Sequence, residues 1–80
     1  MHPMAGRTSL SDSAFKEAVA IVSKHFRKEG TVTNSVLRSL AGLNYDQAIK
    51  FFNRAIADGL LERRGRASGV HYVPTEKLRK

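Results

Sequence analysis

The sequence contains no cysteine and half as many acidic as basic residues. The absence of cysteine excludes disulfide bonds, thiolate zinc sites and cysteine nucleophiles, and it is the usual composition in a reducing cytosol. The longest apolar run, Ala18 to Val22, is far shorter than the roughly 20 residues of a membrane span, and no charged-then-apolar leader opens the chain. We therefore expect an intracellular protein, located in the cytoplasm, the nucleoid or, in a eukaryote, the nucleus.

Metal ligands and catalytic groups are also scarce. His2, His25 and His71 are too scattered for a metal site, and no cluster of acidic residues supplements them. A chain of 80 residues builds one core, which leaves few side chains for a catalytic cleft. The sequence therefore predicts a single domain that is not an enzyme and holds no metal or cofactor.

Basic residues are abundant and unevenly placed. Fourteen lysines and arginines against seven acidic residues give a formal net charge of +7, which attracts polyanions such as nucleic acid. Arg63, Arg64 and Arg66 fall within four positions, and no acidic residue follows Glu62 until Glu76. This placement favours nucleic acid as the partner more strongly than the total charge does.

A first helix is predicted after a flexible arm over residues 1–10. Ser11 or Asp12 is a suitable N-cap, and the helix is predicted to run to about Glu29, where Gly30 ends it in the left-handed conformation. Apolar residues follow at helical spacing and predict its buried face: Phe15, Ala18, Val19, Val22 and Phe26.

A second helix is predicted between Thr33, an N-cap residue, and Gly42, which stops it. Its inward side chains are predicted to be Val36, Leu37 and Leu40.

A third helix is predicted over residues 45–58. Asn44 and Gln47 have the spacing of a capping box, and Gly59 closes the helix. Two helices joined by a three-residue turn that contains glycine are typical of a helix-turn-helix. On the helical wheel the core side of the third helix carries Ala48, Phe51, Phe52 and Ala55, with Ile56 at its edge.

Two strands complete the prediction. Residues 60–64 and 70–73 alternate as strands around a flexible tip at residues 65–69, and Pro74 ends the second strand. Thr31 and Val32 are too short for a stable strand alone, but they can pair as a short third strand at the hairpin edge. The predicted fold is α+β, with a domain at residues 11–74 and a charged tail at residues 75–80.

The stretch TVTNSVLRSLAGLNYDQAIKFFNRAIADGLLERRGRASGVHYV resembles the winged helix-turn-helix superfamily of bacterial and archaeal regulators. The segments SAFKEAVAIV and LNYDQAIKFF are similar to the winged-helix domain that orients the bacterial septal DNA translocase on duplex DNA. Both resemblances imply three helices followed by a β-hairpin wing, with duplex DNA as the partner. The chain would act as a transcriptional regulator or as a module of a larger DNA-handling protein.

Docking of such a fold places the third helix in the major groove and the wing over the backbone. Gln47 or Asn53 can pair with adenine, and Ile49 can meet a thymine methyl group. Lys50 or Arg54 can reach guanine or phosphate. The full set of predicted DNA-contacting residues is Tyr45, Asp46, Gln47, Ile49, Lys50, Asn53 and Arg54 in the third helix, Arg63, Arg64 and Arg66 in the wing, and Thr33, Ser35 and Arg38 at the second helix.

Other interpretations of these residues stay open. The polar helix face is equally a solvated surface, and the arginines can protect an exposed strand edge. Tyr72 and Phe26 can stack on bases or pack in the core. Winged helices also serve as protein interaction or dimerisation modules, including homodimers, and single-stranded DNA or RNA is a further candidate partner.

Overall fold

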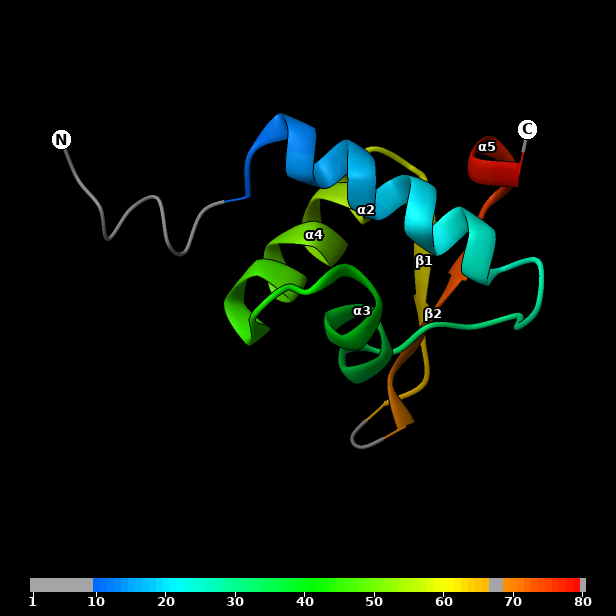
Figure 1. Ribbon diagram of the computed structural model, residues 1–80. Coiled ribbons are helices and arrows are strands. Elements are labelled where there is room, and N and C mark those ends of the chain that lie inside the picture. Colours follow the sequence, from blue (N-terminus) through cyan, green and yellow to red (C-terminus); the bar gives the residue numbers. More distant parts are fainter. Residues whose placement is uncertain (1–9, 67–68, 80) are drawn as a thin grey trace, which may run out of the picture.

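The computed structural model describes residues 10–66 and 69–79. In this part of the chain there are four helices and two strands, in the order α2 (Asp12–His25), α3 (Asn34–Ala41), α4 (Tyr45–Ala57), β1 (Leu61–Arg64), β2 (His71–Pro74) and α5 (Glu76–Arg79) (Figure 1). The predicted α+β class, with three helices followed by a hairpin, is confirmed. The predicted arm at residues 1–9 and residues 67–68 of the predicted flexible tip lie outside the described residues.

The helix starts follow from side-chain caps. Ser11 Oγ accepts the N–H of Ala14 at 3.1 Å, and Thr33 Oγ1 accepts the N–H of Val36 at 3.2 Å. Each cap satisfies an amide that has no partner inside the helix and contributes about 1 kcal/mol. These predicted caps are confirmed.

The predicted end of the first helix is wrong. α2 stops at His25, and Phe26 caps it in the right-handed conformation. Tight turns then follow, in which Lys28 and Glu29 both donate their N–H groups to the carbonyl of His25. Because these bonds already satisfy the helix end, Gly30 is not needed there, and its φ lies outside the left-handed region.

The core lies between α2, α3, α4 and the hairpin. The ring of Phe51 packs against those of Phe15 and Phe52, with centroids 5.3 and 5.4 Å away. Burying such a side chain contributes about 1.5–3 kcal/mol. The buried set is Phe15, Ala18, Val22, Val32, Leu37, Ala48, Phe51, Phe52, Ala55 and Leu61.

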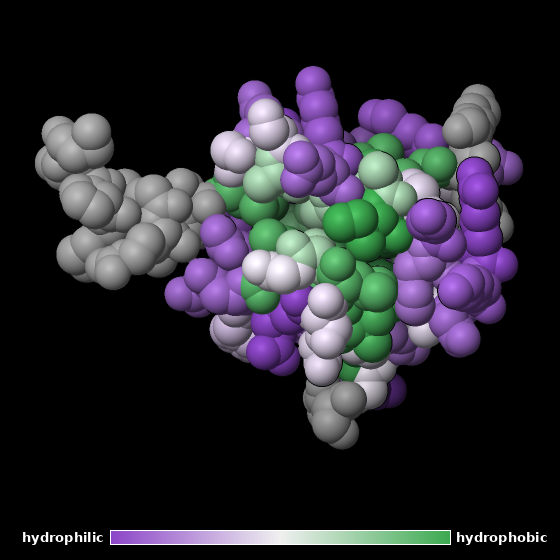
Figure 2. Space-filling view, in the orientation of Figure 1, coloured by the Kyte–Doolittle hydropathy of each residue, from purple (hydrophilic) through white to green (hydrophobic). Residues whose placement is uncertain are grey.

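Leu40 does not face inward as predicted, since it is 43% exposed. It lies about 60° around α3 from the fully buried Leu37. A helix of eight residues offers α2 and α4 only a narrow stripe, and Leu40 falls outside it. On the face shown in Figure 2, apolar residues form a band over α2 and α3 with hydrophilic residues on both sides.

β1 and β2 pair antiparallel, with Arg63 opposite Tyr72 and Arg64 opposite His71. On the other edge of β2, Val32 forms a bridge with Tyr72, in which each residue donates its N–H to the carbonyl of the other at 2.8 to 2.9 Å. The predicted third strand is therefore present as this single bridge.

The chain after Pro74 folds back instead of forming a plain charged tail. α5 places Leu78 against the core, and Lys77 Nζ donates to the carbonyl of Asp58 at 2.7 Å. An apolar contact and an anchored lysine thus attach this segment to the domain. Over the described residues, every helix is too short or too polar to cross a lipid bilayer.

Candidate nucleic-acid interface

The turn between α3 and α4 is fixed by local contacts. Gly42 ends α3 with φ 68°, a left-handed conformation that disfavours a Cβ atom. Asn44 Oδ1 accepts the N–H of Gln47 at 2.8 Å, and Gln47 Oε1 accepts the N–H of Asn44 at 3.1 Å. This is the predicted capping box, and it uses the side chain of Gln47 to hold the first turn of α4.

α4 has one buried side and one exposed side. Ala48, Phe51, Phe52 and Ala55 are buried, as predicted. The exposed side chains form what we call the open flank: Tyr45, Asp46, Ile49, Lys50, Asn53, Ile56 and Ala57.

The open flank borders the hairpin. Phe52 stacks on Tyr72 of β2, with 3.7 Å between centroids and 7° between ring planes. Ile49 and Ile56 stand three residues before and four after Phe52, so they lie along the same edge of α4. They are 37% and 38% exposed, which leaves two apolar side chains accessible where the flank meets the hairpin.

Arg54 lies at the other edge of α4 and is engaged within the chain. Its Nη1 donates to Asp12 Oδ1 at 2.7 Å, and its guanidinium carbon stands 4.2 Å from the ring centroid of Phe15. Asp58 Oδ2 lies 3.9 Å from its Nε. Although exposed ion pairs contribute at most about 1 kcal/mol, these contacts point Arg54 at α2 and away from the open flank.

The neighbouring arginines of β1 point to opposite faces of the hairpin, because side chains alternate along a strand. Arg63 shares the face of Leu61, which is buried, and is paired with Tyr72, which packs on α4. Arg64 lies on the other face, where its Nη2 donates to Glu62 Oε1 at 2.7 Å. Arg63 thus lies on the hairpin face that packs against α4, and Arg64 lies on the opposite face.

The hairpin tip carries Arg66 and extends past α3, at the end of the molecule away from α2 (Figure 1). Gly65 has φ 80°, and a Cβ atom there would overlap the carbonyl oxygen of Gly69. His71 Nδ1 donates to that same carbonyl at 2.8 Å. The close approach of residues 65 and 69 narrows the base of the tip, and Arg66 is exposed just beyond it.

The three predicted contacts at the start of α3 have different surroundings. The hydroxyl of Thr33 caps the helix, whereas Ser35 is exposed. Arg38 Nε donates to Asn34 Oδ1 at 2.7 Å, and its guanidinium carbon stands 5.6 Å from the ring centroid of Tyr45. This last contact joins α3 to the first turn of α4 through an exposed aromatic ring.

The cations of α4 and the hairpin differ in whether they form ion pairs. Among the described residues, Lys50, Arg63 and Arg66 form no ion pair, whereas Arg54 and Arg64 do. Asp46 is the acidic residue of the open flank. Lys50, Arg63 and Arg66 are thus available to an anion without first breaking an ion pair.

Ile56 belongs to the same surface and is absent from the predicted contacts. Its position at the edge of the predicted core on the helical wheel was the available signal.

No protein-family model and no curated protein sequence matches the chain. Over the described residues, no three histidine, aspartate or glutamate side chains gather into a potential metal site.

Proposed function

We propose that this domain is a winged helix-turn-helix that binds duplex DNA, with α4 in the major groove and the hairpin over the phosphate backbone. The observation that carries the proposal is the position of Arg63. It lies on the face of β1 that packs against α4, and it has no ion-pair partner among the described residues. Together with Lys50 and Arg66 it supports one continuous cationic surface that spans a helix and a hairpin.

The open flank suits a groove because it mixes chemistries. Asn53 can pair bidentately with adenine, Ile49 can contact a thymine methyl group, and Lys50 can reach guanine or a phosphate. Asp46 disfavours phosphates, but it lies in the first turn of α4, where a carboxylate favours the helix dipole and can accept from cytosine. Arg64 and Arg54, both engaged elsewhere, are not included in this surface.

A protein partner is the second candidate. Tyr45, Ile49 and Ile56 are 58%, 37% and 38% exposed on one helix, and exposed aromatic and aliphatic side chains are typical of interaction surfaces. Lys50 of the same helix and Arg63 and Arg66 of the hairpin, which form no ion pair among the described residues, favour an anionic surface on any such partner.

The salt dependence of duplex binding tests the first proposal. If Lys50, Arg63 and Arg66 each neutralise one phosphate, affinity for a labelled duplex falls about 40-fold between roughly 50 and 200 mM salt. Fluorescence anisotropy measures how the affinity changes with salt concentration. Duplex and single-stranded competitors in the same assay measure the preference for duplex over single-stranded nucleic acid. Affinity that is independent of salt would overturn the proposal, and stronger competition by the single strand would replace duplex with single-stranded nucleic acid.

The matched control is Lys16→Gln, which removes one positive charge from the exposed face of α2. It lowers the net charge as much as Arg63→Gln does. Equal losses in both variants would mean that net charge, and not the proposed surface, drives binding.

A further inference from the structure

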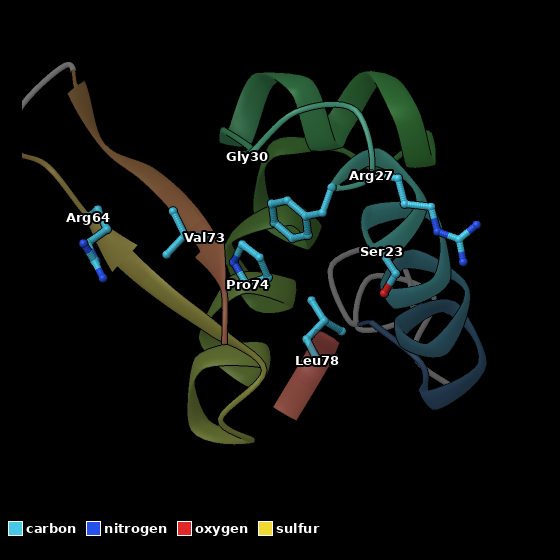
Figure 3. Close-up of a pocket in the computed structure, with 8 residues that line it drawn as sticks. Ser23, Arg27, Gly30, Arg64, Val73, Pro74 and Leu78 are labelled. Atoms are coloured by element: carbon cyan, nitrogen blue, oxygen red, sulfur yellow. The ribbon is translucent and has the colours of Figure 1, made fainter. Parts of the chain in front are cut away.

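A cavity of about 660 Å³ lies on the other side of the hairpin from the open flank. Four segments line it, namely the end of α2, the turn at Gly30, the hairpin and α5 (Figure 3). Val73 and Arg64 mark its hairpin wall, and both belong to the strand face opposite to Arg63 and Tyr72. The cavity is therefore separate from the proposed DNA surface.

The lining of the cavity is apolar in the middle and cationic at two edges. Phe26, Val73, Pro74 and Leu78 supply the apolar part. In Figure 3, Pro74 and Leu78 stand between the hairpin and α2, and Val73 lies over the hairpin. An apolar ligand body placed there would be partly removed from water by side chains from α2, β2 and α5, which stabilises it by about 25 cal/mol per Å² of buried area.

The polar groups of the lining are Ser23 and two arginines. Arg64 stands at the hairpin side, and Arg27 stands at the α2 side with its guanidinium extending away from Pro74 and Leu78 (Figure 3). The eight lining residues include no carboxylate. Glu62 bonds to Arg64 from the adjoining part of the same strand face, but an exposed ion pair of this kind is worth at most about 1 kcal/mol and gives way to a ligand.

We propose that this cavity binds a small organic anion that joins one carboxylate to an apolar body, such as an aryl-alkyl or medium-chain carboxylate. The volume lies within the range of small-molecule sites, about 300–1,000 Å³. The carboxylate accepts hydrogen bonds from Arg64, or from Arg27 once that exposed side chain turns toward the cavity, because the guanidinium fork matches its geometry. The body packs on Phe26, Val73 and Leu78. Duplex DNA does not fit the apolar lining.

A titration of the isotopically labelled protein, followed by nuclear magnetic resonance, tests whether the cavity binds such an anion. The probes are 4-phenylbutyrate and octanoate, and their neutral amides are the matched controls. We expect saturable shifts at the amides of Phe26, Gly30, Val73 and Leu78 with both carboxylates, and binding at least about tenfold weaker with both amides. Absence of shifts up to about 10 mM carboxylate, or equal binding of the amides, would overturn the proposal.

Two variants locate the anion contact. Arg64→Gln and Arg27→Gln remove a guanidinium from either edge of the cavity, and at least one should weaken carboxylate binding about fivefold or more. Lys16→Gln, outside the cavity, should leave the affinity unchanged. Loss of affinity in Lys16→Gln equal to that in the arginine variants would contradict a specific contact. The titration contains no nucleic acid, so its outcome is independent of duplex binding.

Discussion

The ring of Tyr72 lies parallel to the ring of Phe52, with 3.7 Å between their centroids. This stack joins β2 to α4, and the reciprocal bridge to Val32 holds the same tyrosine from the other side. Tyr72 therefore fixes the hairpin relative to the helix that carries the open flank. Of the two interpretations of Tyr72, the stack on Phe52 supports packing against the core.

Replacement of Tyr72 by alanine should destabilise the fold. The substitution removes the stack and leaves a gap over Phe52, and since Tyr72 is only half-buried we expect a loss of about 2–3 kcal/mol in the free energy of unfolding. Urea denaturation measures it. Tyr72→Phe keeps the ring and should stay within about 0.5 kcal/mol of the parent protein. Equal losses in both variants would mean that the hydroxyl, and not the stack, is what matters.

Arg63→Gln and Arg64→Gln should differ in duplex binding, although the two residues are neighbours. We expect Arg63→Gln to weaken binding about tenfold and to lower the salt slope by about one, because one phosphate contact is lost. Arg64→Gln should cost clearly less, since that side chain points to the other face and is paired with Glu62. Anisotropy titrations at several salt concentrations measure both. A larger loss of duplex affinity in Arg64→Gln than in Arg63→Gln would contradict the assignment of Arg63 to the DNA-facing side of the hairpin.

Two glycine substitutions should have opposite effects on stability. At Gly42 a Cβ atom meets no neighbour, but φ 68° makes alanine strained, so Gly42→Ala should cost about 1–2 kcal/mol. At Gly30 the space is equally open and the backbone is outside the left-handed region. Gly30→Ala should therefore be neutral or stabilise by up to about 1 kcal/mol through the unfolded state. Thermal melts followed by circular dichroism compare the stability of the two variants. A destabilised Gly30→Ala variant would support the sequence-based prediction that Gly30 has the left-handed conformation.

Leu78→Ala should reveal that α5 is part of the domain. Leu78 is half-buried against the core, so its truncation should cost about 1–2 kcal/mol, less than the loss at a fully buried leucine. Glu76→Ala, an exposed substitution in the same turn, should change stability by less than about 0.5 kcal/mol. Chemical denaturation of both variants measures the difference. If Leu78→Ala were as stable as Glu76→Ala, the contact of Leu78 would not stabilise the domain, and residues 75–80 would be a tail as predicted from the sequence.

The helix boundaries that depend on local chemistry were predictable. The caps at Ser11, Thr33 and Asn44 and the left-handed Gly42 need only a few neighbouring residues, and each signal is present in the sequence. The prediction that Gly30 ends the helix was wrong because the turns at Lys28 and Glu29 already satisfy the helix end. A glycine alone does not distinguish a C′ position from a loop.

The candidate surface was less predictable, because it depends on register and on distant partners. The sequence shows an arginine cluster, but only the pairing of Arg63 with Tyr72 tells which arginine faces α4. Likewise, Arg54 occupies a polar position on the helical wheel, and its ion pair with Asp12 joins residues far apart in the chain. Leu78, one apolar residue within a charged segment, gives no periodic signal at all.

The reciprocal bridge between Val32 and Tyr72 encloses α3, α4 and β1 within one loop of chain. Pairings between such distant residues form after the local helices during folding, since closing a long loop costs entropy. Fraying from either chain end leaves this pair intact, so neither amide hydrogen should exchange with deuterated solvent until the whole domain opens. The short link thus makes the helices and the hairpin a single cooperative unit.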